Sequence, residues 1–323
     1  MDDYIIGMYV GGALGDALGA PHEYFRSKAR YNGKLEHSIV RQSRFQGTKV
    51  GVVGEITDDT EMTIALLASL AKNNHAYVKN DVIKMYLKFA NNCSFLGNNT
   101  RALFYGIKTE QGYYSRFSKT FDTQESKNTM QSNGCLMRAS ALALASNTNE
   151  ALEDVMLTNP NEFCKHIVTI YVNILKLLLC LYEEHRDFKK QKIIAYLTAE
   201  QKDTKYDQGI RDLIQDVLHI KERVVNGKDK GWITHAFYCA LFGLLHFDSF
   251  SKAMNYVIEL GGDTDTNAAI MGNLCGAFYG LTQLELEQKD NINMLNNCDS
   301  SKSDFNHSFS FQEGLQLIQR LAK

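Results

Sequence analysis

The stretch YIIGMYVGGALGDALGA, residues 4–20, indicates how the fold is built. Its glycines recur at every fourth position, so on an α-helix they form one bare stripe along a single face: Gly7, Gly11, Gly15 and Gly19. Glycine in a helix interior costs about 1 kcal/mol relative to alanine, so the stripe needs a compensating role. Close approach of another helix is the simplest such role.

A second glycine stripe lies towards the other end of the chain. Residues 266–281 read as an apolar helix and carry Gly272, Gly276 and Gly280 at the same spacing. We infer that both helices pack tightly at the centre of one domain, though not necessarily on each other.

Composition favours helices for the rest of the chain. With 323 residues, 44% of them hydrophobic, the protein can bury a sizeable core. It has only 2 prolines, whereas an all-β protein of this size spends more proline on its many turns. Apolar periodicity predicts helices over 61–73, 81–90, 136–145, 163–184, 189–198, 209–225, 232–247, 250–260 and 312–321. Strand-like alternation is best at 39–53, while 109–130 reads as a loop and 287–308 as a loose polar excursion.

Charge and cysteine usage exclude several classes of protein. The net charge of -2 exerts no long-range attraction on nucleic acid or on an anionic membrane. The longest apolar run, 167–182, is interrupted by Asn173 and Lys176, so we expect no membrane span. The 7 cysteines include no C-x-x-C pair, and the first residues are acidic. We therefore expect an intracellular, cytoplasmic protein, which we take to be a monomer.

Two acidic clusters stand immediately before apolar helices: Thr57-Asp58-Asp59 and Asp263-Thr264-Asp265-Thr266. Helix capping explains one acid at each place, but it does not require paired acids flanked by hydroxyls. Carboxylate and hydroxyl oxygens select hard cations, with Mg²⁺ the natural candidate and Mn²⁺ close behind. If the clusters meet in space, they could hold two ions.

The ordered set of motifs resembles the ADP-ribosylglycohydrolase family, which includes dinitrogenase reductase-activating glycohydrolase and the ADP-ribosyl-arginine and ADP-ribosyl-serine hydrolases. The resemblance spans residues 4–281. The matching motifs are Gly15-Asp16 with Glu23, Thr57-Asp58-Asp59-Thr60-Glu61-Met62, Asn133-Gly134-Cys135-Leu136-Met137-Arg138, His166 at the head of a long helix, Gly231-Trp232, and Gly261-Gly262-Asp263-Thr264-Asp265-Thr266 with the glycine stripe behind it.

This resemblance implies a fold and a site. The fold is all-α: one compact orthogonal helical bundle over residues 1–323, with a binuclear magnesium site in a central cleft. The activity is hydrolytic removal of ADP-ribose from modified protein. By motif, the metal ligands would be Thr57, Asp58, Asp59, Asp263, Asp265 and Thr266. The substrate-binding residues would be Ser132, Asn133, Gly134, His166 and Trp232. Glu23 would handle the proton at the bond to be cut, a role that Asp58 or Asp59 could also fill.

Other interpretations remain open at this stage. The same fold could serve a non-catalytic ADP-ribose binder or a crystallin-like structural protein. Asp263-Thr264-Asp265-Thr266 also looks similar to the Asp-x-Asp motif of haloacid dehalogenase phosphatases, but no apolar strand precedes it. The bond that is cut, to arginine, serine or nucleic acid, stays undecided. Asp16 and Arg138 are better read as a structural hydrogen-bonding residue and a buried ion-pair partner.

Overall fold

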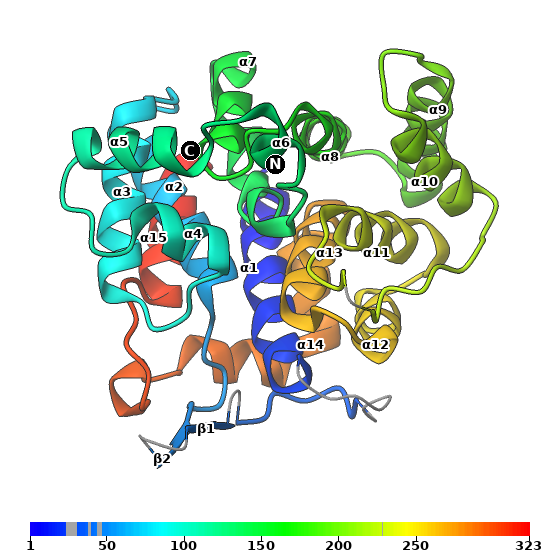
Figure 1. Ribbon diagram of the computed structural model, residues 1–323. Coiled ribbons are helices and arrows are strands. Elements are labelled where there is room, and N and C mark those ends of the chain that lie inside the picture. The colour runs from blue at the N-terminus through cyan, green and yellow to red at the C-terminus, as the bar shows by residue number, and fades with distance from the viewer. Residues whose placement is uncertain (24–30, 38–39, 44–46, 228) are drawn as a thin grey trace.

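The glycine-striped helices form the centre of the molecule (Figure 1). The computed structural model describes all residues except 24–30, 38–39, 44–46 and 228. Helix α1 (Asp2–Gly19) and helix α13 (Thr264–Tyr279) lie side by side, and nearly every residue of both is buried. The two central helices predicted from the sequence are thereby confirmed, and the structure adds that they pack directly on each other.

The contact between these helices is backbone against backbone. A Cβ atom built on Gly11 would lie 2.4 Å from the Gly272 carbonyl oxygen, and one on Gly276 would lie 2.0 Å from that of Gly7. Gly19 faces the Thr264 carbonyl in the same way, so the helices run antiparallel. Their orientation has a functional consequence, because it places the end of α1 beside the start of α13, where the second acidic cluster lies.

Other helices cover this pair on both sides (Figure 1). On one side α2 (Asp58–Lys72) packs against α3 (Lys79–Asn92) and α15 (Phe311–Leu321). On the other side α11 (Ile233–His246), α12 (Phe250–Leu260) and α8 (Glu162–Cys180) contact α13. The all-α fold class is therefore confirmed.

The remaining elements are shorter or peripheral. They are α4 (Asn98–Phe104), α5 (Glu110–Thr120), α6 (Gln124–Asn128), α7 (Thr148–Ala151), α9 (Arg186–Lys202), α10 (Gln208–Leu218), α14 (Leu281–Asn296), and 3-10 turns at Ala20–His22, Asn133–Cys135, Ala139–Leu144, Leu152–Leu157 and Ser300–Lys302. Within the predicted strand region, β1 (Val40–Ser43) and β2 (Gly47–Val50) pair antiparallel, with Val40 opposite Val50.

Four segments differ from the sequence prediction. The predicted helix at 209–225 ends at Leu218, the last residue of α10. Residues 109–130 are largely helical rather than a loop, because the Thr109 and Thr123 side chains cap α5 and α6 by accepting backbone N–H groups. The predicted helix at 136–145 is a 3-10 turn over Ala139–Leu144. Helix α14 continues into the predicted excursion as far as Asn296, burying the polar Asn291 beside Ile292.

Two further expectations concern burial. Arg138 is an ion-pair partner as predicted: its Nε lies 2.7 Å from Asp154 Oδ2, and both side chains are fully buried. Among the described helices, α8 alone is long and apolar enough to cross a membrane, despite Asn173 and Lys176. Of its apolar window, 56% is buried inside the protein, and core helices of soluble proteins pass the same test.

Candidate active-site cleft

The first acidic cluster is held in place by helix α1. Thr57 is the N-cap of α2, and its backbone N–H donates to Asp16 Oδ2 at 2.9 Å. The hydroxyl groups of Thr57 and Thr60 donate to the two oxygens of the same carboxylate, at 2.8 and 2.5 Å. Asp16 is fully buried, and both of its carboxylate oxygens accept hydrogen bonds from residues at the start of α2. The structural role predicted for Asp16 is confirmed.

The two acidic clusters meet, although they are far apart in the sequence. The Thr266 hydroxyl at the start of α13 donates to Asp59 Oδ2 at 3.2 Å, and the Thr57 hydroxyl lies at the same distance from that oxygen. The other oxygen, Asp59 Oδ1, is buried and has no hydrogen-bond partner among the described residues. A buried carboxylate oxygen without a partner is costly, so this position calls for a cation or water.

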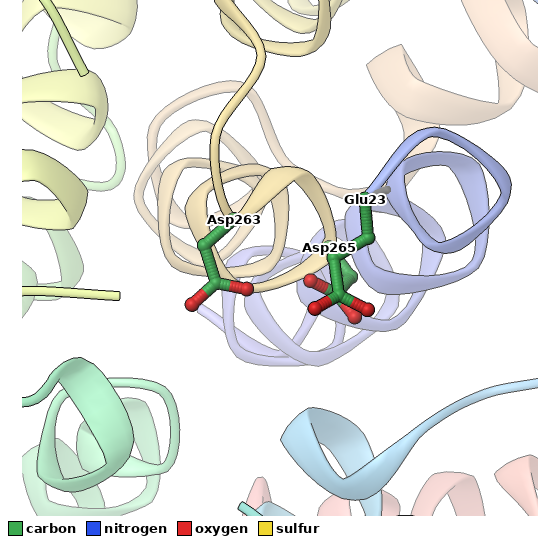
Figure 2. A group of neighbouring side chains, drawn as sticks. All are labelled: Glu23, Asp263 and Asp265. Carbon is green, nitrogen blue, oxygen red and sulfur yellow. The ribbon is translucent and has the colours of Figure 1, made fainter. Parts of the chain in front are cut away.

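Glu23, Asp263 and Asp265 form a second group of acids beside Asp59. One carboxylate oxygen from each lies within 4.8 Å of the others. Figure 2 shows Glu23, just beyond the end of α1, and the two aspartates at the start of α13 directed into the same space. Asn133 fixes one of them, because its Nδ2 donates to Asp263 Oδ2 at 2.8 Å.

The electrostatics of these acids are unfavourable in the absence of a cation. Burial raises the pKa of Asp59 and of Asp265 well above the ordinary range, and repulsion from the neighbouring carboxylates raises both further. Burial likewise raises the pKa of Asp58 to about 6, against the lowering effect of the Gly97 N–H. Among the described residues lining the cleft, Arg101 alone is a lysine, arginine or histidine. Within the described lining of the cleft, the five acids thus outnumber the cations by five to one.

The acids line a cleft of about 540 Å³, a volume within the range of small-molecule sites. Most of the residues predicted for the site line it together: Glu23, Thr57, Asp58, Asp59, Ser132, Asn133, Gly134, Asp263, Asp265 and Thr266. The structure thus brings both acidic clusters and the Asn133 turn to one place.

Two predicted substrate-binding residues, His166 and Trp232, are not among the residues that line the cleft. The His166 ring on α8 packs edge-on against Tyr206, with ring centroids 5.2 Å apart, outside the residues that line the cleft. Trp232 is 42% exposed, so it is not the core residue that tryptophan usually is. It lies at the rim, because its backbone bridges to Ser132 and its neighbour Gly231 lines the cleft.

One wall of the cleft was missed by the sequence analysis. This wall consists of residues 95–101, which lead into α4 and include its first turn. The Gly97 N–H donates to Asp58 Oδ2 at 2.9 Å, and Asn99 Nδ2 donates to Ser132 Oγ at 3.0 Å. The run Gly97-Asn98-Asn99 is a turn signal, but it carries no spacing of chemical groups that would have marked it as a site.

The residues present fit hard divalent cations. The donors at the meeting point are carboxylate and hydroxyl oxygens, which suit Mg²⁺ or Mn²⁺. A cation would relieve a cost at two places: at the partnerless oxygen of Asp59, and where carboxylate oxygens of Glu23, Asp263 and Asp265 lie close together.

Fold and cleft together define a class of protein: an all-helical bundle with an acidic, oxygen-lined cleft at one end of its central helix pair. The chain belongs to the ADP-ribosylglycohydrolase family, whose sequence model matches residues 1–307. The resemblance drawn from the motifs is confirmed.

Named relatives agree with this assignment. A protein of Acanthamoeba polyphaga mimivirus, provisionally named an ADP-ribosyl glycohydrolase, is 25% identical over 295 residues, covering 84% of this chain and 85% of its own. The ADP-ribosyl dinitrogen reductase glycohydrolase of Rhodospirillum rubrum is 25% identical over 285 residues, covering 87% of each chain. A solved structure described as an ADP-ribosylglycohydrolase-related protein complex covers 99% of this chain and 97% of its own, with a TM-score of 0.71 and 19% identity, which shows a shared fold.

Proposed function

We propose that this chain is a magnesium-dependent hydrolase that removes ADP-ribose from modified protein side chains or other ADP-ribosylated acceptors. It would cleave the glycosidic bond at the distal ribose, as a cytoplasmic monomer. The observation that carries the proposal is the meeting of the two acidic clusters around the partnerless Asp59 oxygen. Family membership supplies the substrate class.

Six side chains would hold the metal. Thr57, Asp58 and Asp59 would hold one ion, and Asp263, Asp265 and Thr266 the second, with Asp265 shared between them. Mn²⁺ could replace Mg²⁺ because it accepts the same oxygen ligands. When bound, the cations supply positive charge that orients the ribose hydroxyls and makes a nearby water more acidic.

Side chains of the cleft would transfer the proton at the bond to be cut and stabilise the positive charge that develops on the ribose. Glycoside hydrolysis passes through a state in which the ribose carries positive charge, and the carboxylates of the cleft stabilise that charge. Glu23 is the candidate to hold or give the proton, because its carboxylate faces Asp263 and Asp265 without belonging to either helix (Figure 2). Asp58 and Asp59 remain alternatives.

The rest of the nucleotide would lie along the other walls. Ser132, Asn133 and Gly134 line one side and offer backbone and amide groups. Arg101 lines the wall formed by residues 95–101 and would meet the diphosphate, which needs a cation in a cleft so rich in carboxylates. Trp232 at the rim would contact the outer part of the ligand, whereas the position of His166 behind Tyr206 does not support a direct contact.

The test is release of ADP-ribose from modified substrates in Mg²⁺ and in EDTA. We expect turnover that requires the metal and falls by at least about a thousandfold in Asp58→Ala and in Asp265→Ala, because each change removes a proposed metal ligand. Asp212→Ala, an exposed acid on α10, is the matched control and should retain activity. Strong turnover in either cleft variant would exclude the two-metal assignment.

A substrate panel separates this proposal from the binder alternative. Arginine-, serine- and nucleic-acid-linked ADP-ribose should each be offered, because the rim of the cleft and not the acids would choose the acceptor. Binding of ADP-ribose without turnover on every linkage would support a non-catalytic binder on the same fold.

A further inference from the structure

A buried histidine outside all the sequence motifs lies behind the acidic cleft. His307 stands between two glutamates: its Nε2 lies 2.5 Å from Glu55 Oε1 and its Nδ1 lies 2.9 Å from Glu61 Oε1. The side chains of both glutamates are fully buried, and that of His307 is 6% exposed. Both ring nitrogens are engaged at once, so the ring has a single orientation.

The residues that follow His307 also form hydrogen bonds with Glu61. The backbone N–H groups of Ser308 and Phe309 donate to Glu61 Oε2 at 2.6 and 2.9 Å. The Cys93 thiol donates to the other oxygen at 3.2 Å. Glu61 therefore has all its acceptor positions used, three of the four contacts coming from residues 307–309.

Glu55 and Glu61, the two glutamates that contact His307, stand on either side of the first acidic cluster in the sequence. Glu55 is two residues before Thr57, and Glu61 is two residues after Asp59. Glu61 also belongs to the first turn of α2, where its backbone N–H donates to the Thr57 carbonyl at 3.1 Å. Holding both glutamates from behind therefore restrains the segment 57–59 at each end.

His307 also offsets the negative charge of the two glutamates. Two further carboxylates beside a cleft that already holds five acids would add to the repulsion there. A charged imidazolium between them cancels part of that field. Burial lowers the pKa of His307, but the hydrogen bonds to Glu55 and Glu61 and the charges of these two carboxylates outweigh burial and raise the pKa to about 9, in favour of the charged form.

We propose that His307 is a positioning residue for the cation-binding segment 57–59, so that the C-terminal segment 307–309 is part of the metal site. The inference rests on the proposed metal site. It goes beyond that proposal because His307 is not among the residues that line the cleft, and none of its described contacts is to a proposed ligand. Groups that orient metal ligands from behind typically change metal affinity by about 10- to 100-fold when they are removed.

The experiment is direct titration with Mn²⁺, following free Mn²⁺ by its electron paramagnetic resonance signal. We expect His307→Ala to weaken Mn²⁺ binding by about tenfold or more. His307→Gln keeps one donor for a glutamate and should fall between His307→Ala and the unaltered protein, which also serves if His307→Ala does not fold.

Ser310→Ala is the control for a merely structural role. Ser310 caps α15 by accepting the Glu313 N–H, so its loss destabilises the same C-terminal segment without touching Glu55 or Glu61. Its Mn²⁺ affinity should match that of the unaltered protein. Unchanged Mn²⁺ affinity in both His307 variants would overturn the positioning role, whereas absence of Mn²⁺ binding in the unaltered protein would instead overturn the proposed function.

Discussion

The two ends of one helix pair behave in opposite ways. Along most of their length α1 and α13 touch through glycine backbones, with no room for a methyl group. At the end where α1 stops and α13 starts, the same pair presents acids that repel one another around a cleft of about 540 Å³. Tight packing and unfavourable charge are therefore neighbours in this helix pair, and the packed part must supply the stability that the acidic part lacks.

The packed region should tolerate no side chain. In Gly276→Ala the new Cβ would lie 2.0 Å from the Gly7 carbonyl oxygen, so the helices must separate. We expect a loss of more than about 3 kcal/mol in the free energy of unfolding, measured by denaturant titration, or loss of soluble protein. Gly227→Ala is the control, because no described atom lies within 4 Å of its Cβ. Equal stability of the two variants would contradict the packing argument.

His307, between the buried carboxylates of Glu55 and Glu61, should make the stability of the protein depend on pH. The folded pKa of His307, about 9, is above the ordinary 6.5, so its contribution is complete below about pH 6.5 and is lost as the pH rises through about 9. The difference in free energy of unfolding between the unaltered protein and His307→Gln should shrink by up to about 3 kcal/mol over that window. Parallel stability curves for the two proteins would show that His307 does not titrate as described.

The acidic region should become more stable when an acid is neutralised. Burial and repulsion raise the pKa of Asp265, so its ionised form destabilises the metal-free protein near neutral pH. Asp265→Asn keeps an oxygen for the Thr266 N–H and should have a higher free energy of unfolding than the unaltered protein in EDTA. Thermal unfolding with and without Mg²⁺ tests this, and the metal-induced stabilisation of the unaltered protein should be lost in the variant. A destabilised variant in EDTA would mean that repulsion is not the dominant effect.

The smallest effect is expected at Arg101, in the cleft wall formed by residues 95–101. Arg101 is exposed, so replacing it with Gln should cost about 1 kcal/mol of substrate binding, seen as a rise of about fivefold in KM with kcat unchanged. Lys108→Gln, an exposed cation outside the cleft, is the control. An unchanged KM would remove Arg101 from the binding site.

The sequence predicted some parts of the molecule well for identifiable reasons. Glycine stripes and paired acids are local patterns with a strong chemical meaning, and they indicated both the central helices and the acids of the cleft. The wall at residues 95–101 could not be predicted in the same way, because its role comes from where a turn lies and not from which groups it carries. His307 was missed for a related reason: a single histidine in a polar segment has no pattern until its glutamates are beside it.

The sequence by itself determined the chemistry, namely an all-helical chain with two oxygen-rich acidic clusters and the motifs of the ADP-ribosylglycohydrolase family. Only the tertiary structure decided that α1 and α13 pack antiparallel on each other and that Thr266 donates to Asp59. It also decided that His307 lies between Glu55 and Glu61. The physical reason is the distance along the chain over which each effect acts. Helix periodicity and ligand chemistry act over a few residues, whereas the juxtaposition of residues 59, 266 and 307 depends on how all the buried surfaces fit together.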